Sequence, residues 1–122
     1  MLTSPALTRE FLQFHSGACE HEVSGMLHLD SRHRLIASII SSAVRSAARP
    51  SIREVVKATL RHNAAAVVLY HNQPSGLSEP SADDELITRR LVDALRLVDI
   101  RVLDHFIVAG SEVLSFAERG LL

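Results

Sequence analysis

The sequence predicts an α/β fold in which helices flank a mixed β-sheet. Residues 22–30 alternate between apolar and polar side chains, which is typical of a strand with two different faces. Residues 64–70 form an apolar run that suits a buried strand and is too short to span a membrane. Residues 51–60 and 82–98 carry apolar side chains three and four positions apart, the pattern of amphipathic helices.

Length and composition limit the kind of protein this chain forms. At 122 residues, 47% of them apolar, it is large enough for one hydrophobic core and too small for two. The net charge of −1 argues against extensive nucleic-acid binding, which needs a clear basic excess. The single cysteine, Cys19, excludes an internal disulfide and fits a reducing compartment. Without a visible signal peptide or membrane segment, we expect a cytoplasmic protein with no membrane partner.

The first half of the chain is expected to contain a helix and a hairpin. Ser4-Pro5 marks a helix start, because proline is favoured at the first helical position. The strand at residues 22–30 is followed by a polar turn at 30–33 and a second apolar strand at 35–40, which together predict a hairpin. Residues 41–50 are small and polar, as in a loop.

The second half alternates helices and strands. Ser51 with Glu54 resembles a capping box, and His62-Asn63 provides a stop signal for the helix between them. A strand running into His71 is broken by Pro74 and Pro80 before the next helix begins at residue 82. The expected elements that close the chain are a strand at 101–108, a short strand at 112–115 and at most one helical turn at 116–119.

Polar residues at the end of the central strand form the candidate site. His71 and Gln73 are two positions apart, so an extended backbone places them on the same side. Asp84 returns in the first turn of the next helix, where Ser81 is the capping residue. Nitrogen and carboxylate ligands with an open position are the pattern of a catalytic zinc site, and Gln73 could point at the same ion. A strand with a polar exit, in which His71 is only a hydrogen-bonded histidine, remains the alternative.

These residues also carry a family resemblance. The run His71-Asn72-Gln73-Pro74, with Ser81 and Asp84 at fixed spacing, resembles the JAMM (MPN⁺) metalloprotease motif with its second histidine replaced by Gln73. More narrowly, the continuation through residues 75–76 and the Pro80-Ser81 pair resemble the RadC family. The resemblance covers nearly the whole chain, including the later blocks at 103–108 and 115–120.

The resemblance implies a fold, a set of site residues and an activity. The implied fold is the MPN fold, similar to that of cytidine deaminases, as one domain over residues 1–122 with no N-terminal helix–hairpin–helix region. The implied metal ligands are His71, Gln73 and Asp84, which would hold Zn²⁺. Glu22 would be the general base, with Glu20 a weaker competitor, and the Ser81 hydroxyl would stabilise the oxyanion. The implied activity is a zinc-dependent isopeptidase or amidase acting on a peptide or isopeptide.

Departures from the family pattern keep other functions open. Gln73 offers a neutral amide oxygen where zinc prefers imidazole or thiolate, so we expect weak zinc binding or none. Ala43-Val44 and Ser51-Ile52 also differ from the usual family residues. The alternatives are a catalytically impaired MPN module that binds a protein partner, and a DNA-repair factor, which rests on the family's label only. A homodimer joined through an exposed strand edge is also compatible with the sequence.

The remaining histidines and arginines are expected to have structural roles or to lie at the surface. We expect His105, which lies with Asp104 inside an apolar strand, to need buried partners. Its alternative role is to replace the missing imidazole of the metal site. A solvated face is expected for the arginines in and near the longest helix, which are Arg89, Arg90, Arg96 and Arg101. The histidines expected to touch solvent are His15, His21, His28, His33 and His62.

Overall fold

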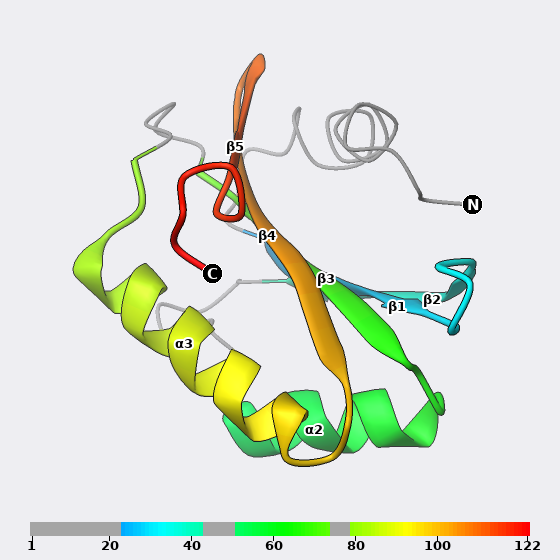
Figure 1. Cartoon of the computed structure of the whole chain (residues 1–122). Helices are drawn as coiled ribbons and strands as arrows, with labels where there is room; N and C mark the ends of the chain where they lie inside the picture. Colours follow the sequence, from blue (N-terminus) through cyan, green and yellow to red (C-terminus); the bar gives the residue numbers. More distant parts are fainter. Residues whose placement is uncertain (1–22, 43–50, 74–78) are drawn as a thin grey trace.

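The computed structural model describes residues 23–42, 51–73 and 79–122. Within these ranges it confirms an α/β arrangement with one mixed sheet (Figure 1). The helix expected at Pro5 and most of the loop expected at 41–50 lie outside the described residues. The elements are β1 (Val23–Leu29), β2 (Leu35–Ser42), α2 (Ile52–Arg61), β3 (Ala66–Asn72), α3 (Ala82–Arg96), β4 (Arg101–Ala109) and β5 (Glu112–Ser115).

The sheet has the strand order β2-β1-β3-β4-β5. Strand β1 is antiparallel to both β2 and β3, and β5 is antiparallel to β4. Strands β3 and β4 are parallel, so the chain must cross back between them, and α3 makes that connection. Helices α2 and α3 lie on the same side of the sheet (Figure 1). Neither helix is long and apolar enough to cross a bilayer, as far as the described residues show.

Strand β3 is buried over its whole length because both of its faces meet apolar clusters. Successive side chains of a strand point to opposite faces, so Val67 and Leu69 face the helices while Val68 and Tyr70 face away. The cluster on the helix side contains Met26, Val55, Val67, Leu69, Leu91, Leu95 and Ile100. The cluster on the other face contains Leu27, Leu29, Ala66, Val68, Tyr70, Phe106 and Val108.

The helix boundaries follow the capping signals in the sequence. Helix α2 begins after Ser51, whose Oγ accepts the backbone N–H of Glu54 at 3.2 Å. It ends before Asn63, which takes the left-handed conformation at φ 50°. Helix α3 ends at Arg96, two residues earlier than expected, because a second left-handed residue, Asp99 at φ 61°, turns the chain.

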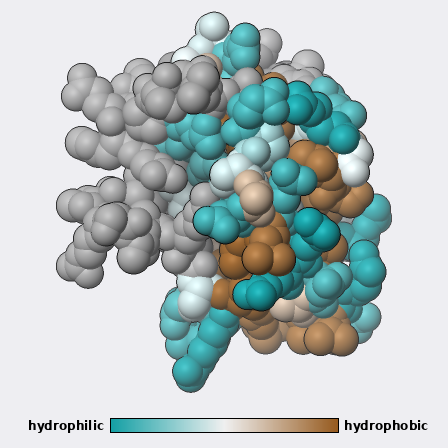
Figure 2. Space-filling view, turned by 90° about the vertical axis from the view of Figure 1, so that its left-hand side faces the viewer, coloured by the Kyte–Doolittle hydropathy of each residue, from teal (hydrophilic) through white to brown (hydrophobic). Residues whose placement is uncertain are grey.

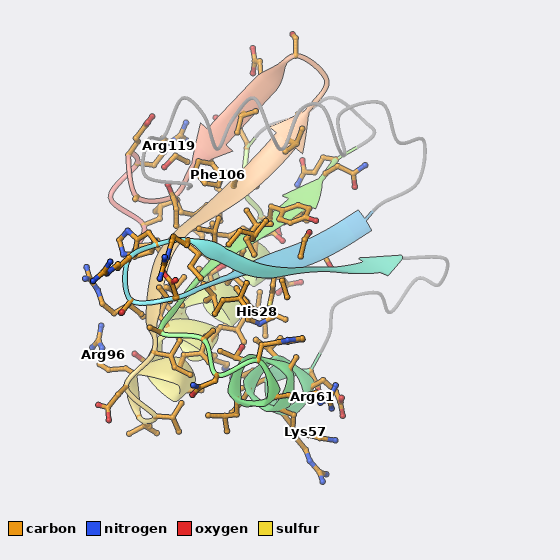
Figure 3. The ribbon with its side chains drawn as sticks, turned by 90° about the vertical axis from the view of Figure 1, so that its right-hand side faces the viewer. His28, Lys57, Arg61, Arg96, Phe106 and Arg119 are labelled. Atoms are coloured by element: carbon orange, nitrogen blue, oxygen red, sulfur yellow. The ribbon has the colours of Figure 1, made fainter. Side chains whose placement is uncertain are left out.

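The outer face of α3 is charged and exposed. Arg89, Arg90 and Arg96 are all exposed, which confirms the solvated face predicted for them. That side of the molecule is mostly hydrophilic, with scattered hydrophobic groups (Figure 2). On α2, Lys57 and Arg61 likewise project away from the sheet (Figure 3). The polar faces of both helices are therefore turned to solvent.

The predicted hairpin is closed by the carboxylate of Asp30. One of its oxygens accepts the backbone N–H groups of Arg32 and Arg34, both at 2.8 Å. The other accepts the Arg34 Nε–H at 2.7 Å. The backbone N–H of Arg34 is the main reason that the pKa of Asp30 lies below its usual value. His33 completes the turn in the left-handed conformation, at φ 61°.

The expectation that His28 touches solvent is wrong. Its side chain is 0% exposed and points from β1 toward α2 (Figure 3), where Nε2 lies 3.2 Å from Thr59 Oγ1. The Thr59 hydroxyl donates to the Val55 carbonyl at 2.7 Å, so it accepts from His28 Nε2–H. Burial, followed by repulsion from His62, lowers the pKa of His28 to about 4. Helix α2 covers a strand face that looks polar in the sequence.

The lowered pKa of His28 predicts a loss of stability in acid. The ordinary value is 6.5 and the folded value is about 4, so on acidification the unfolded chain takes up the proton first. Stability contributed by neutral His28 is present above about pH 6.5 and is lost down to about pH 4. Between about pH 7 and about pH 4.5, His28→Gln should lose ~2 kcal/mol less unfolding free energy than the wild type.

Urea denaturation at the two pH values measures this difference. His33→Gln is the matched control, because it removes a histidine from the β1–β2 turn instead of the core. An unchanged pH dependence in His28→Gln would mean that His28 does not sense the burial described here.

Candidate metal centre

The buried stripe of α3 changes from apolar to polar toward the start of the helix. Leu95 and Leu91 pack in the core, and Thr88 and Asp84 continue the stripe with exposures of 0% and 1%. Residues three or four apart lie on the same helix face, so these four form one row. Because α3 follows β3 in the chain, the polar end of this row meets the end of β3.

The structure brings His71 and Asp84 together. His71 is the second-last residue of β3, is 6% exposed and lies on the helix side of the sheet. Its Nε2 is 3.9 Å from Asp84 Oδ1. An imidazole nitrogen and a carboxylate oxygen thus face each other across a short gap between strand and helix.

Asp84 is held in place by the capping box predicted from the sequence. Its Oδ2 accepts the backbone N–H of Ser81 at 3.0 Å, and its own N–H donates to Ser81 Oγ at 3.0 Å. The positive end of the helix favours a carboxylate at this position. With Oδ2 bonded to the backbone, Oδ1 is the oxygen that faces His71.

His105 lies on the Nδ1 side of the His71 ring, whereas Asp84 lies on its Nε2 side. Its Nε2 is 2.9 Å from His71 Nδ1, and its Nδ1 is 2.7 Å from Thr88 Oγ1. One face of its ring stacks on Phe116, with centroids 4.5 Å apart. Since its ring nitrogens face His71 Nδ1 and Thr88, His105 does not replace the missing imidazole between His71 and Asp84.

Asp104 connects strand β4 at His105 to the turn that follows β5. Its Oδ1 accepts the backbone N–H groups of His105 at 2.7 Å and Ala117 at 3.0 Å. Its Oδ2 accepts the hydroxyl of Ser115. The Phe116 N–H also donates to the His105 carbonyl at 3.0 Å. These bonds confirm the expectation of buried partners for residues 104 and 105, and they keep the Phe116 ring over His105.

Of the other predicted site residues, the structure describes Gln73 and Ser81. The Gln73 N–H donates to the Val108 carbonyl at 2.8 Å, which continues the β3–β4 ladder past the end of β3. Ser81 is exposed at the start of α3. Glu22 and its competitor Glu20 lie outside the described residues. Ser24, two residues after Glu22, pairs directly with His71 in the β1–β3 register.

Two nearby hydroxyl residues were missed in the sequence. Ser24 Oγ is buried, and the described part of the chain offers it no hydrogen-bond partner. Its register opposite His71 is set by long-range pairing that the sequence does not reveal. Thr88 could have been found, because it follows Asp84 by four residues on a predicted helix and therefore shares its face.

The donor atoms of His71, Gln73 and Asp84 suit a metal ion only in part. No three His, Cys, Asp or Glu side chains within 23–42, 51–73 and 79–122 group as metal ligands. His71 and Asp84 are two side chains of these types, and Gln73 is of another type. Zinc bonds of about 2.0–2.2 Å at a tetrahedral angle would place two ligand atoms about 3.4 Å apart. The observed 3.9 Å is close enough for small side-chain movements to fit zinc.

Comparisons with known proteins agree on one family. The family model described as RadC-like JAB domain matches residues 2–121. A UPF0758 protein of Nitrosococcus oceani is 53% identical over 100% of this chain and 55% of its own length. Relatives of the same name from Thioalkalivibrio sulfidiphilus and Aromatoleum aromaticum are 55% and 54% identical over 99% and 98% of the chain, each with 54% of its length covered. The chain thus spans about half the length of these relatives.

The two N-cap serines predict a matched pair of stability losses. Ser81→Ala and Ser51→Ala each remove a hydroxyl that accepts a backbone N–H, so each should lower the unfolding free energy by about 1 kcal/mol in urea denaturation. Hydrogen exchange should accelerate at the Asp84 amide only in Ser81→Ala and at the Glu54 amide only in Ser51→Ala. A Ser81→Ala protein with wild-type stability and Asp84 protection would contradict the capping geometry.

Proposed function

This chain belongs to the RadC family, through a JAB domain that covers nearly all of it, and we propose that it is a zinc-dependent hydrolase of amide or isopeptide bonds. The observation that carries the proposal is the 3.9 Å approach of His71 Nε2 to Asp84 Oδ1. Both side chains are buried, and both stand at positions that match the JAMM motif. An imidazole and a carboxylate in one protected gap are the start of a catalytic metal site.

Three residues would hold the metal. His71 and Asp84 would supply the nitrogen and oxygen ligands, and the amide oxygen of Gln73 would be the third donor. When bound, zinc supplies a Lewis acid for a carbonyl group and favours deprotonation of water. Because amide oxygen is a poorer zinc ligand than imidazole, binding should be weaker than with two histidines.

Glu22 and Ser81 would carry the proton transfer and the charge stabilisation. Glu22 would take a proton from the attacking water and return it to the leaving amine. Its support is its position in the family motif and the register of Ser24, two residues later, opposite His71. Ser81 Oγ accepts a bond from the Asp84 N–H, so its own hydrogen can be donated to an oxyanion. Its exposure makes it accessible to a substrate.

The second candidate function is a non-catalytic module that binds a protein partner. Gln73 favours it, because the weakest ligand stands where the family motif has a histidine. A role in DNA binding receives no support from charge. The chain has a net charge of −1, and the exposed arginines of α3 share that helix with acidic residues in its first turn.

Zinc titration by calorimetry is the first test of the metal site. The wild-type protein should bind one zinc ion weakly, and His71→Asn and Asp84→Asn should lose that binding. Gln73→His should raise the affinity at least about tenfold, because imidazole replaces an amide oxygen. His33→Asn, on the β1–β2 turn, should leave it unchanged. Equal affinity in wild type and Gln73→His would argue that Gln73 does not face the metal.

Hydrolysis of fluorogenic peptides with a lysine isopeptide bond tests the activity. In the presence of zinc, Ser81→Ala should lower kcat by about a hundredfold while leaving zinc affinity near wild type, because Ser81 acts on the oxyanion. Glu22→Gln should also lower kcat without loss of zinc. If zinc-loaded Gln73→His cleaves none of these peptides, the hydrolase proposal fails and the module that binds a partner is favoured.

A further inference from the structure

We propose that Thr88 and His105 are positioning residues that fix the proton on His71 Nδ1, so that the lone pair of His71 Nε2 faces Asp84. This inference extends the proposed function, because the cation that would lie between Nε2 and Asp84 is the zinc ion. It concerns two residues that do not contact that position themselves. The hydrogen bonds that fix this proton run from Thr88 on α3 through His105 on β4 to His71 on β3.

The first proton is that of the Thr88 hydroxyl. Thr88 Oγ1 lies 2.7 Å from the carbonyl oxygen of Asp84, one helical turn earlier. A carbonyl oxygen can only accept, and two oxygens this close need a hydrogen between them. The single hydroxyl hydrogen of Thr88 is therefore directed to Asp84.

The next two protons follow from the first. Having donated its hydrogen, Thr88 Oγ1 must accept from His105 Nδ1, which lies 2.7 Å away. A neutral imidazole with a proton on Nδ1 has an acceptor at Nε2. His105 Nε2 is 2.9 Å from His71 Nδ1, so His71 must donate there. His71 is thus left with an acceptor at Nε2.

This arrangement of protons favours a cation between His71 and Asp84. His71 Nε2 and Asp84 Oδ1 are both acceptors, 3.9 Å apart and both buried. A positive ion between two such atoms stabilises the arrangement. The opposite proton order would put a hydrogen on His71 Nε2 and block it as a ligand. It would also leave Thr88 Oγ1 and the Asp84 carbonyl 2.7 Å apart without a hydrogen.

The chain of hydrogen bonds is rigidly built. Thr88 is 0% exposed and His105 is 6% exposed, so water does not compete freely for these bonds. The His105 ring is stacked on Phe116 with an angle of 18° between the ring planes. Partners of this kind fix the tautomer and orientation of a ligating histidine, and their loss typically weakens metal binding by about 10–100-fold.

Nitrogen NMR of the metal-free full chain, labelled with ¹⁵N in its imidazole rings, tests the tautomer directly. At about pH 8, above the ordinary pKa of histidine, wild-type His71 should carry its proton on Nδ1. Thr88→Val, which removes the hydroxyl and keeps the shape, should give a mixture of tautomers at His71. Zinc affinity should fall about 10–100-fold, and Thr88→Ser should restore both properties.

Thr59→Val is the matched control for the threonine change. Thr59 is also fully buried in a helix, donates to the carbonyl four residues earlier and meets a histidine, His28, at 3.2 Å. It should lose comparable stability while leaving the His71 tautomer and zinc affinity unchanged. A proton on Nε2 of wild-type His71, or an unaltered tautomer in Thr88→Val, would overturn the inference. The predicted tautomer in a protein that binds no zinc would support the proton arrangement and count against the hydrolase.

Discussion

Helix α3 must bury one continuous row of side chains, and the first two members of that row are polar. A buried carboxylate is costly unless it is paired and hydrogen-bonded. Asp84 meets this requirement with the backbone N–H of Ser81 and with the positive end of α3. Thr88 meets it with the Asp84 carbonyl and with His105. His105 of β4 contacts Thr88, and His71 of β3 faces Asp84, so the polar end of α3 lies against the histidines of both strands.

The same pairing of threonine with histidine occurs twice among the residues that the structure describes, with a different consequence in each place. At α2, Thr59 meets His28, and burial keeps that imidazole neutral with a pKa of about 4. At α3, Thr88 meets His105, and the hydrogen bonds continue to His71, whose Nε2 faces Asp84 at 3.9 Å. Of these two sets of contacts, only the one at α3 leads to a carboxylate, that of Asp84. This difference separates a histidine that serves packing from histidines arranged around a candidate metal position.

Much of the fold, and the local surroundings of His71 and Asp84, follow from short-range signals in the sequence. The capping box of Ser81 and Asp84, the hairpin at Asp30 and the buried strand ending near His71 each depend on residues a few positions apart. The same α/β arrangement agrees with a JAB domain of the RadC family.

Long-range contacts explain what the sequence did not reveal. His28 looks like part of a polar strand face, and only the packing of α2 over β1 buries it. The position of His105 behind His71 depends on the parallel β3–β4 register, which shifts between Val67 and Val68. No local pattern encodes such a shift, so spacing alone could not decide which of His71 and His105 faces Asp84.

The central claim is that His71 and Asp84 hold one zinc ion between them, and anomalous diffraction at the zinc edge tests it most directly. Crystals of the full chain grown with saturating zinc should show a peak about 2.0–2.2 Å from both His71 Nε2 and Asp84 Oδ1. A peak bound elsewhere on the chain, or an ordered His71–Asp84 pair with no zinc between them, would contradict it.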